Sequence, residues 1–318
     1  TTTLNGCSST CEKIVTVNDT TAPTWTTQAN ALNVTLQCSD TAGLTAAQNQ
    51  TPVAADNCGG TVTYTKVSGN FAAGTCANSG TYTNTWTAKD ICNNTSTVFT
   101  QVITIQDTTA PTWTTAPTAL NVTLECSDTA GLTAAQNQAP VATDNCGGTV
   151  TYTKISGTFA AGTCANSGTY TNTWTAKDVC NNTSTVFTQI ITIQDTTAPT
   201  WTTSAGSLNA TVECSNTAGL AAAQALFPTA SDLCDADVSN IIKVSGQFVA
   251  SLGCGNAGTY TNTWTVKDDC GNTSETFTQV ITIQDTTAPT WATAPTALNV
   301  TLECSDTAGL ATAQAQFP

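Results

Sequence analysis

The stretch Asp-Thr-Thr-Ala-Pro-Thr-Trp occupies residues 107–113 and recurs at residues 19–25, 195–201 and 285–291. The tryptophans of the four copies are separated by 113−25 = 88, 201−113 = 88 and 291−201 = 90 residues. A fixed period of this length, with whole segments repeated almost verbatim, indicates tandem copies of one folded unit. Proline fixes one backbone dihedral angle and pushes the residue before it towards extended conformations, so the stretch has the character of a short linker.

The period divides the chain into five segments. Three complete repeats are predicted at residues 22–109, 110–197 and 198–287, called repeats 1, 2 and 3 below. Residues 1–21 are expected to be the C-terminal tail of a preceding repeat, because Ile14-Val15-Thr16-Val17 stands where Ile103-Thr104-Ile105 stands before the next linker. Residues 288–318 begin a fourth, truncated repeat. We therefore expect a window from a longer, extended array.

Composition narrows the function classes. The 318 residues are 40% hydrophobic, which is enough for packed cores, but only 9% are charged and the net charge is −14. An acidic chain without Arg lacks the clustered cations that nucleic-acid phosphates need. No apolar run approaches ~20 residues, so no segment is expected to insert into a membrane. Histidine, the usual general base at neutral pH, is absent, and we expect no enzyme.

Cysteine is the notable exception to this bland composition. Repeats of 88 to 90 residues are marginal on core burial alone, and each of them carries four of the 15 cysteines. The twelve are Cys38, Cys58, Cys76 and Cys92 in repeat 1, Cys126, Cys146, Cys164 and Cys180 in repeat 2, and Cys214, Cys234, Cys254 and Cys270 in repeat 3. An even count in small domains predicts a disulfide framework and an oxidising compartment. Zinc is disfavoured, because the chain has neither Cys-x-x-Cys nor His.

The hydrophobic alternation within a repeat is that of strands. In residues 119–126, Leu120, Val122 and Leu124 share one face. Further strands are predicted at 149–155, with Val150 and Tyr152 inward, at 169–177, and in the segment that holds Phe187, Ile191 and Ile193. In the 169–177 strand, the predicted inner face holds Tyr170, Asn172, Trp174 and Ala176. The Ala-rich stretch 128–138 is expected to form a short helical turn. These elements predict a β-sandwich of antiparallel sheets with Trp174 in the core and Trp113 at the joint.

Four phrases of repeat 2 resemble a known family. They are Ala-Thr-Asp-Asn-Cys-Gly at 142–147, Ser-Gly-x-Phe-x-x-Gly at 156–162, Thr-Trp-Thr-Ala-Lys-Asp-x-Cys-x-Asn-Thr-Ser at 173–184, and Ile-Thr-Ile-x-Asp-Thr-Thr-Ala-Pro at 191–199. Together they resemble the hyalin repeat (HYR), in particular the HYR-like repeats of very long secreted proteins and surface adhesins of Bacteroidota. The resemblance covers all three repeats and both partial ones. It implies tandem immunoglobulin-like sandwich domains in an extracellular array.

Spacing alone cannot fix the disulfide connectivity, since four cysteines allow three pairings. If the strand ending at Cys126 runs alongside the last strand, Cys126 and Cys164 lie at the far end of the repeat and Cys146 and Cys180 at the near end. We therefore predict Cys126–Cys164 and Cys146–Cys180, with equivalent pairs in repeats 1 and 3. A Cys164–Cys180 bridge would have to span a strand on the order of 30 Å long.

Acidic and amide residues recur at the near end of each repeat. Asp107 lies in the linker, Asp144 precedes a strand, and Asp178 and Asn182 lie in a hairpin turn. Oxygen ligands that converge at a joint suit Ca²⁺, which would stiffen the array. The alternative is that these residues cap turns through their own backbone. No other cofactor is expected.

Two kinds of glycosylation signal are present. Asn-x-Ser/Thr triplets occur at Asn33, Asn121, Asn209 and Asn299, and again at Asn94, Asn182 and Asn272. The second kind is implied by the family resemblance: Asp-Thr-Thr and Asp-Thr-Ala resemble the O-glycosylation motif of Bacteroidota. They would place glycans on Thr20, Thr41, Thr108, Thr129, Thr196, Thr286 and Thr307. Threonine is also a common exposed residue of strands, which is the plainer explanation.

These observations predict a structural extracellular protein, a repetitive stalk or fibre of cell-surface or adhesin type carrying covalent glycans. Its expected partners are the neighbouring repeats, and chains could also associate sideways. The alternative is an adhesion module that binds glycans or surfaces through loops at the joints. Near-identical loops in repeats 1 and 2 favour the spacer over a set of readers.

Overall fold

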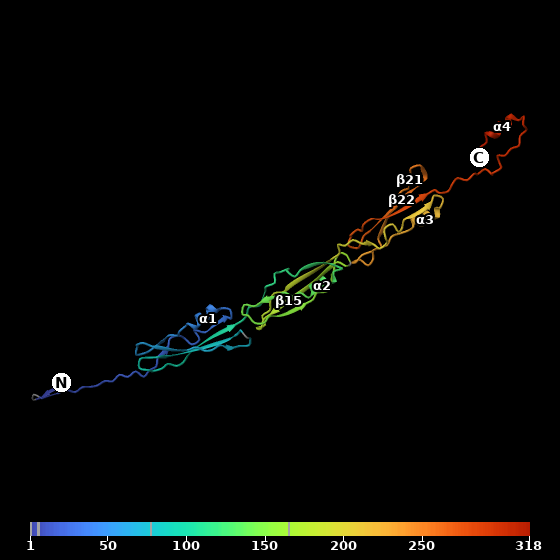
Figure 1. Cartoon of the computed structure of the whole chain (residues 1–318). Coiled ribbons are helices and arrows are strands. Elements are labelled where there is room, and N and C mark those ends of the chain that lie inside the picture. The colour runs from blue at the N-terminus through green and yellow to red at the C-terminus, as the bar shows by residue number, and fades with distance from the viewer. Residues whose placement is uncertain (1, 5–6, 77, 165) are drawn as a thin grey trace. The chain divides into compact units, whose positions relative to one another are not determined.

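The computed structural model describes residues 2–4, 7–76, 78–164 and 166–318 (Figure 1). Its residues form two compact units. Unit 1 comprises Thr1–Leu124, Asp128–Ala160 and Gly168–Thr192, and unit 2 comprises Glu125–Ser127, Ala161–Ser167 and Ile193–Pro318. The predicted tail at 1–21 therefore lies partly outside the described residues. Among the described residues, no helix has the length and apolarity needed to cross a membrane.

The same set of elements appears in each of the three predicted repeats (Figure 1). Repeat 1 contains β3 (Thr24–Trp25), β4 (Val34–Gln37), α1 (Thr41–Gln48), β5 (Ala54–Ala55), β6 (Thr63–Val67), β7 (Ala72–Ala73), β8 (Gly80–Lys89) and β9 (Phe99–Gln106). Repeat 2 contains β10 (Thr112–Trp113), β11 (Val122–Glu125), α2 (Thr129–Gln136), β12 (Ala142–Thr143), β13 (Thr151–Ile155), β14 (Ala160–Ala161), β15 (Gly168–Lys177) and β16 (Phe187–Gln194). Repeat 3 contains β17 (Thr200–Trp201), β18 (Ala210–Glu213), α3 (Thr217–Gln224), β19 (Ala230–Ser231), β20 (Ile241–Val244), β21 (Val249–Ser251), β22 (Cys254–Val266) and β23 (Phe277–Gln284).

The remaining elements flank the repeats. Strands β1 (Thr2–Leu4) and β2 (Cys7–Ser9) form a hairpin, and α4 (Thr307–Gln314) repeats the short helix. Residues 10–23 contain no strand, and Ile14 and Val17 are 86% and 87% exposed. The prediction that residues 14–17 occupy the place of a final strand is therefore wrong for the described chain, because no strand lies beside them to pair with.

A long hairpin forms the centre of each five-stranded sheet. In repeat 1, β8 and β9 pair antiparallel from Gly80 opposite Ile105 to Trp86 opposite Phe99. Strand β6 flanks β8, and β4 flanks β9 in the order β4-β9-β8-β6, while β7 pairs separately with β8. The first long strand thus lies alongside the last, as predicted. It does so in parallel, which corrects the expectation of purely antiparallel sheets. A second, two-stranded sheet, β3-β5, provides the other layer.

The predicted inward face of the central strand is confirmed. In β15, Trp174 is 2% exposed and Ala176 is fully buried, while in β16 Phe187 and Ile191 are 5% and 0% exposed. Alternation on a half-buried strand places every second side chain in the core. The short helix is also confirmed: Asp128 accepts a hydrogen bond from the Gly131 N–H at its start.

Two predicted positions differ from the structure. Tyr152 is 43% exposed rather than inward, because β13 is the edge strand, and its hydroxyl group bonds the backbone of Ala142. Trp113 packs on Phe187 and Tyr152 of its own repeat, with ring centroids 5.3 and 6.1 Å away, instead of packing across the joint. Its indole N–H donates to the Thr185 carbonyl oxygen.

A buried pair of amides ties the helix to the sheet. Asn172 and Gln189 are both fully buried and face each other across β15 and β16. The Asn172 amide donates to Gln189 and to Gln136 of α2, and its oxygen accepts from the Gly157 N–H. Gln189 in turn donates to the carbonyl oxygen of Ala135. Buried polar groups with all partners in place specify one arrangement of the core, and the same pair recurs as Asn84/Gln101 and Asn262/Gln279.

The Asn172→Ala variant tests this network. It leaves the Gln189 and Gln136 oxygens and the Gly157 N–H without their partner, so we expect the local unfolding free energy to fall by about 2–4 kcal/mol. Amide hydrogen exchange in β15 and β16 measures that loss. The exposed neighbour Thr171→Ala is the matched control, with an expected change within about 0.5 kcal/mol. Equal protection in both variants would contradict the assigned role.

Candidate functional site: the joint between repeats

Four disulfides connect one repeat to the next. Cys38 is bonded to Cys146, Cys76 to Cys180, Cys126 to Cys234 and Cys164 to Cys270. We call the junction of repeats 1 and 2 joint 1 and that of repeats 2 and 3 joint 2, so that each joint is bridged twice. The Cα atoms of the bonded residues are 5.2 to 5.8 Å apart, within the normal range for disulfides.

The predicted pairings within a repeat are therefore wrong. The structure does not bond Cys38 to Cys76, Cys58 to Cys92, Cys126 to Cys164, Cys146 to Cys180, Cys214 to Cys254 or Cys234 to Cys270. Sequence reasoning located each cysteine at an end of its repeat, and then sought partners only within that end. The linker is short enough to bring the far end of one repeat against the near end of the next, so the bonded sulfur belongs to the neighbour.

Unit 2 reflects this covalent arrangement. Its two short segments from repeat 2, Glu125–Ser127 and Ala161–Ser167, are those that carry Cys126 and Cys164. Both cysteines are bonded to repeat 3, at Cys234 and Cys270.

The remaining cysteines follow the same rule. Among the described residues, Cys58, Cys92, Cys214 and Cys254 are free and exposed, as are Cys11 and Cys304. Cys58 and Cys92 occupy the places of Cys146 and Cys180, which bond to a preceding repeat. Cys214 and Cys254 occupy the places of Cys126 and Cys164, which bond to a following one. Each unpaired position is thus one whose partner belongs to another repeat.

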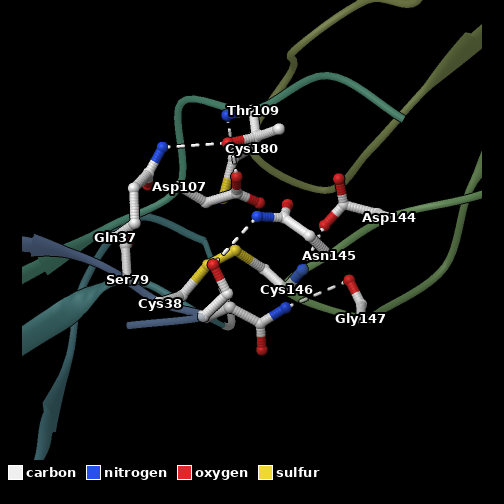
Figure 2. The surroundings of a disulfide bond; sticks show 12 residues. Gln37, Cys38, Ser79, Asp107, Thr109, Asp144, Asn145, Cys146, Gly147 and Cys180 are labelled. Carbon is white, nitrogen blue, oxygen red and sulfur yellow. Dashed lines mark hydrogen bonds between the residues drawn. A yellow bond between two sulfur atoms is a disulfide. The ribbon is translucent and has the colours of Figure 1, made fainter. Parts of the chain in front are cut away.

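Three carboxylates meet at joint 1. Oxygens of Asp107, Asp144 and Asp178 lie within 4.8 Å of one another, and Asp107 and Asp178 are 7% and 5% exposed. Figure 2 shows the Asp107 carboxylate beside the Cys38–Cys146 bridge, with Asp144 and Asn145 of repeat 2 next to it. The structure thus brings together the three aspartates predicted as a calcium site.

Each carboxylate of this cluster uses one oxygen for a local turn. Asp107 Oδ1 accepts from the Thr109 N–H at 3.1 Å, and Asp144 Oδ2 accepts from the Cys146 N–H at 2.8 Å. Asp178 Oδ1 accepts from the Cys180 and Asn182 N–H groups. The turn-capping interpretation is correct for these oxygens. It leaves Asp107 Oδ2 and Asp144 Oδ1 buried without any hydrogen-bond partner.

Asn182 has a different place from the predicted one. Its side-chain N–H₂ group donates to the Asp107 carbonyl oxygen at 3.1 Å and to Asp178 Oδ2 at 2.8 Å. It fastens the linker to the hairpin turn of repeat 2 and turns hydrogen-bond donors, not an oxygen ligand, towards Asp107 and Asp178. Asn272 makes the same two bonds at joint 2, to Asp195 and Asp268.

Polar contacts close the rest of joint 1. The Asn145 amide donates to Ser39 Oγ at 3.0 Å, and the Asn78 amide donates to the Gly147 carbonyl oxygen at 3.2 Å. Gln37 donates to the Thr108 hydroxyl at 2.7 Å, which anchors the linker to the end of β4. Side chains from both repeats and the linker therefore fix the joint together with the bridges.

At joint 2, Glu125 stands where Gln37 stands at joint 1. Its carboxylate accepts from the Thr196 hydroxyl at 2.7 Å, the Thr196 N–H at 3.0 Å and the Gln194 amide at 3.0 Å. These bonds, that of the Thr196 hydroxyl first, lower the pKa of Glu125. The linker is thus held by a charge-assisted set at this joint, and Glu213 holds Thr286 in the same way.

The predicted glycosylation positions fall into distinct environments. All seven O-linked candidates (Thr20, Thr41, Thr108, Thr129, Thr196, Thr286 and Thr307) are exposed. Three of the triplet asparagines, Asn33, Asn121 and Asn209, accept a backbone N–H bond from the last strand, and Asn299 is exposed. The amide nitrogens of Asn94, Asn182 and Asn272 are already bonded inside a joint. A glycan on that nitrogen would displace these bonds.

These features define a class: tandem β-sandwich repeats that are cross-linked to one another at every joint between complete repeats. Comparison with known families gives the particular one. Residues 114–193 and 202–283, together more than half of the chain, match the family described as "HYR-like domain with 4 cysteines". The chain therefore belongs to this HYR-like family. Residues 71–114 also match a family described as "LRR adjacent". Family membership and disulfides in tandem domains are features of an extracellular repeat protein.

No curated protein matches the chain. Among solved structures, PcdhgB3 EC1-4 is 14% identical, with 65% of this chain and 57% of that chain covered and a TM-score of 0.27. Drosophila N-cadherin EC1-3 is 10% identical, with 65% and 77% covered and a TM-score of 0.21. The sialic acid binding region of a Streptococcus sanguinis adhesin is 14% identical, with 84% and 79% covered and a TM-score of 0.18. At these TM-scores the likeness supports no inference about function.

The pKa of Asp107 provides a test of the joint. Burial raises the pKa of Asp107, and the charges of Asp144 and Asp178 raise it further, against the Thr109 N–H bond. A carboxyl group whose folded pKa is raised binds its proton more tightly in the folded state. Its contribution to stability is therefore greatest below the unfolded pKa of about 4 and falls as pH rises through the folded pKa.

We expect wild type to lose stability relative to Asp107→Asn between about pH 4 and neutral pH, in buffer free of divalent cations. Differential scanning calorimetry of both full chains across this range measures the difference in unfolding temperature. Because the asparagine does not titrate, other groups cancel in the comparison. A difference that stays constant with pH would show that Asp107 has no raised pKa in the joint.

Proposed function

We propose that this chain is a structural segment of an extracellular stalk or fibre of cell-surface adhesin type, without catalytic activity. The observation that supports the proposal best is the pair of disulfides that crosses each joint between complete repeats. A binding domain needs only internal staples. Bonds from each repeat to the next are useful when the connection between repeats itself must resist separation.

The covalent path through the repeats is short. From Cys38 it crosses to Cys146, follows the chain for 164−146 = 18 residues, and crosses again from Cys164 to Cys270. Without disulfides the same path runs through 270−38 = 232 residues. At full extension these paths measure roughly 60 and 800 Å. An oxidised array that is pulled from its ends therefore cannot unravel by unfolding its repeats.

The second bridge makes each joint redundant. If Cys38–Cys146 is broken, joint 1 remains closed by Cys76–Cys180, and that path continues from Cys180 to Cys164 through 180−164 = 16 residues. A single reduced bond therefore lengthens the path only modestly. This redundancy suits a fibre that carries load in an environment where occasional bonds are lost.

Glycosylation and lateral association belong to the same proposal. The exposure of all seven candidate threonines supports O-linked glycans of the Bacteroidota type, and a net charge of −14 would keep bare chains apart. The Asp-Thr-Thr candidates sit in the linkers, beside the joints. Glycans there would shield the joint cysteines and linkers from reductants and proteases.

A pocket at joint 1 favours a second candidate function, recognition of glycans by the joint. It has a volume of about 230 Å³ and is lined by Phe71, Tyr82, Asn78 and Gln37, among others. The two rings pack with centroids 5.2 Å apart, and the amides offer hydrogen bonds. The volume is below the range of about 300–1,000 Å³ that is usual for ligand sites, so the spacer remains the primary proposal. Saturable binding of a defined oligosaccharide would favour this second function.

Single-molecule stretching of the full chain tests the proposed load-bearing role. We expect the oxidised chain to reach its length limit early, because only about 60 Å of chain between Cys38 and Cys270 can be extended. With reductant present, the same span should extend to roughly 800 Å, a gain of more than tenfold.

Two variants serve as matched controls. Cys38→Ser removes one bridge of joint 1 and should leave the span short, because Cys76–Cys180 still closes the joint. Cys38→Ser with Cys76→Ser removes both bridges and should lengthen the span several-fold. If the oxidised wild type extends as far as the reduced chain, the joints are not covalently locked and the proposal is wrong.

A further inference from the structure

Two buried carboxylate oxygens at joint 1 have no partner. Asp107 Oδ2 and Asp144 Oδ1 are inaccessible to solvent and make no hydrogen bond, although Asp107 as a whole is only 7% exposed. Leaving an ionised oxygen buried and unpaired is costly, since the charge has lost its water without gaining a donor. An orphaned oxygen of this kind requires an explanation.

The surroundings offer no protein cation to these oxygens. The groups within 4.8 Å are the third carboxylate, Asp178, and the sulfurs of Cys38 and Cys146, which also lie within that distance of Asp107. Those sulfurs are bonded to each other and cannot serve as thiolate ligands. Of the seven lysines, none is bonded to this cluster in the described chain; Lys154, for example, contacts the Gln136 carbonyl oxygen and lies over Trp174.

We infer that Asp107, Asp144 and Asp178 form a binding site for a hard divalent cation, of which Ca²⁺ is the best fit. All available ligand atoms are carboxylate oxygens, the ligands that Ca²⁺ prefers, and three carboxylates with water can supply its six to eight positions. Asp107 comes from the linker, while Asp144 and Asp178 come from two different loops of repeat 2. The ion therefore ties the linker to the repeat that follows it.

The same arrangement recurs at joint 2. Asp195, Asp232 and Asp268 occupy the equivalent positions, Asp195 and Asp268 are 8% and 7% exposed, and Asp232 Oδ2 is buried without a partner. Both Asp232 and Asp268 lie close enough to Asp195 for their charges to raise its pKa. An orphaned buried oxygen at both joints, in units whose sequences differ, is the mark of a site that each joint repeats.

Isothermal titration of the oxidised full chain with CaCl₂ tests this inference. We expect saturable binding with a dissociation constant of about 1 mM or tighter, and a higher unfolding temperature in about 5 mM CaCl₂ than in chelator. MgCl₂ and KCl at matched ionic strength should give a smaller rise, which separates binding from screening of the carboxylates.

The Asp144→Asn variant identifies the site. Its side-chain oxygen can still accept from the Cys146 N–H, and its new N–H₂ group faces Asp107, so the joint should remain folded. We expect the number of bound ions to fall by one. Asp128→Asn, at the exposed start of α2, removes the same charge and should leave the number unchanged.

Two results would overturn the inference. The first is a wild type that binds no Ca²⁺ and melts at the same temperature with and without it. The second is an equal loss of binding in Asp128→Asn, which would show attraction to net charge alone. Either result leaves the disulfide-locked fibre untouched, because stretching and disulfide mapping do not depend on the cation.

Discussion

The pair of disulfides across each joint is the constraint on which the rest of this structure depends. Each bond closes a loop of 104 to 108 residues, longer than a whole repeat. In the chain-entropy account, a bridge over a loop of this length restricts the unfolded chain by roughly 4–5 kcal/mol, although the mechanism of this stabilisation is model-dependent. Because each loop contains parts of two repeats, the stability of one repeat is coupled to that of the next. In ordinary repeat arrays this coupling arises only through noncovalent interfaces between neighbours.

The bridges also explain why acidic residues are buried at the joint. Bonding Cys38 to Cys146 holds the end of one repeat against the loops of the next, and the linker carboxylate of Asp107 is enclosed between them. Asn182 then fastens the linker backbone to the hairpin turn. Burial and neighbouring charges would disfavour such a cluster in isolation. A joint that is covalently closed can retain it, and a bound cation would convert the electrostatic cost into a further tie.

Much of the fold could be predicted from the sequence, because the core follows local alternation. The positions of Trp174, Ala176, Phe187 and Ile191 in the core follow from a period of two residues, and the helix at Asp128 from its capping side chain. The parallel pairing of the first and last long strands was not visible in this pattern, since alternation carries no direction. The exposure of Tyr152 was missed for a related reason: only the strand order shows that β13 lies at an edge.

The candidate site could be predicted only in part. The sequence placed Asp107, Asp144 and Asp178 together at one end of a repeat, because turn residues of antiparallel hairpins gather there. It also placed Cys126 and Cys164 at the opposite end. What it could not supply was the partner, since the spacing of four cysteines within a repeat gives no information about contacts between repeats. One signal was available: the unpaired cysteines of partial repeats fit a pattern in which each repeat bonds to its neighbours.

Tryptic peptide mapping of the native, non-reduced chain tests the central claim most directly. The only basic residues are seven lysines, so trypsin isolates Cys76 in residues 67–89 and Cys164 in residues 155–177. Bonding between repeats predicts that 67–89 is linked to 178–243, through Cys180, and that 155–177 is linked to 268–318, through Cys270. Linkage of 67–89 to 14–66 and of 155–177 to 90–154 would instead show bridges within each repeat. That result would contradict the covalently locked joint.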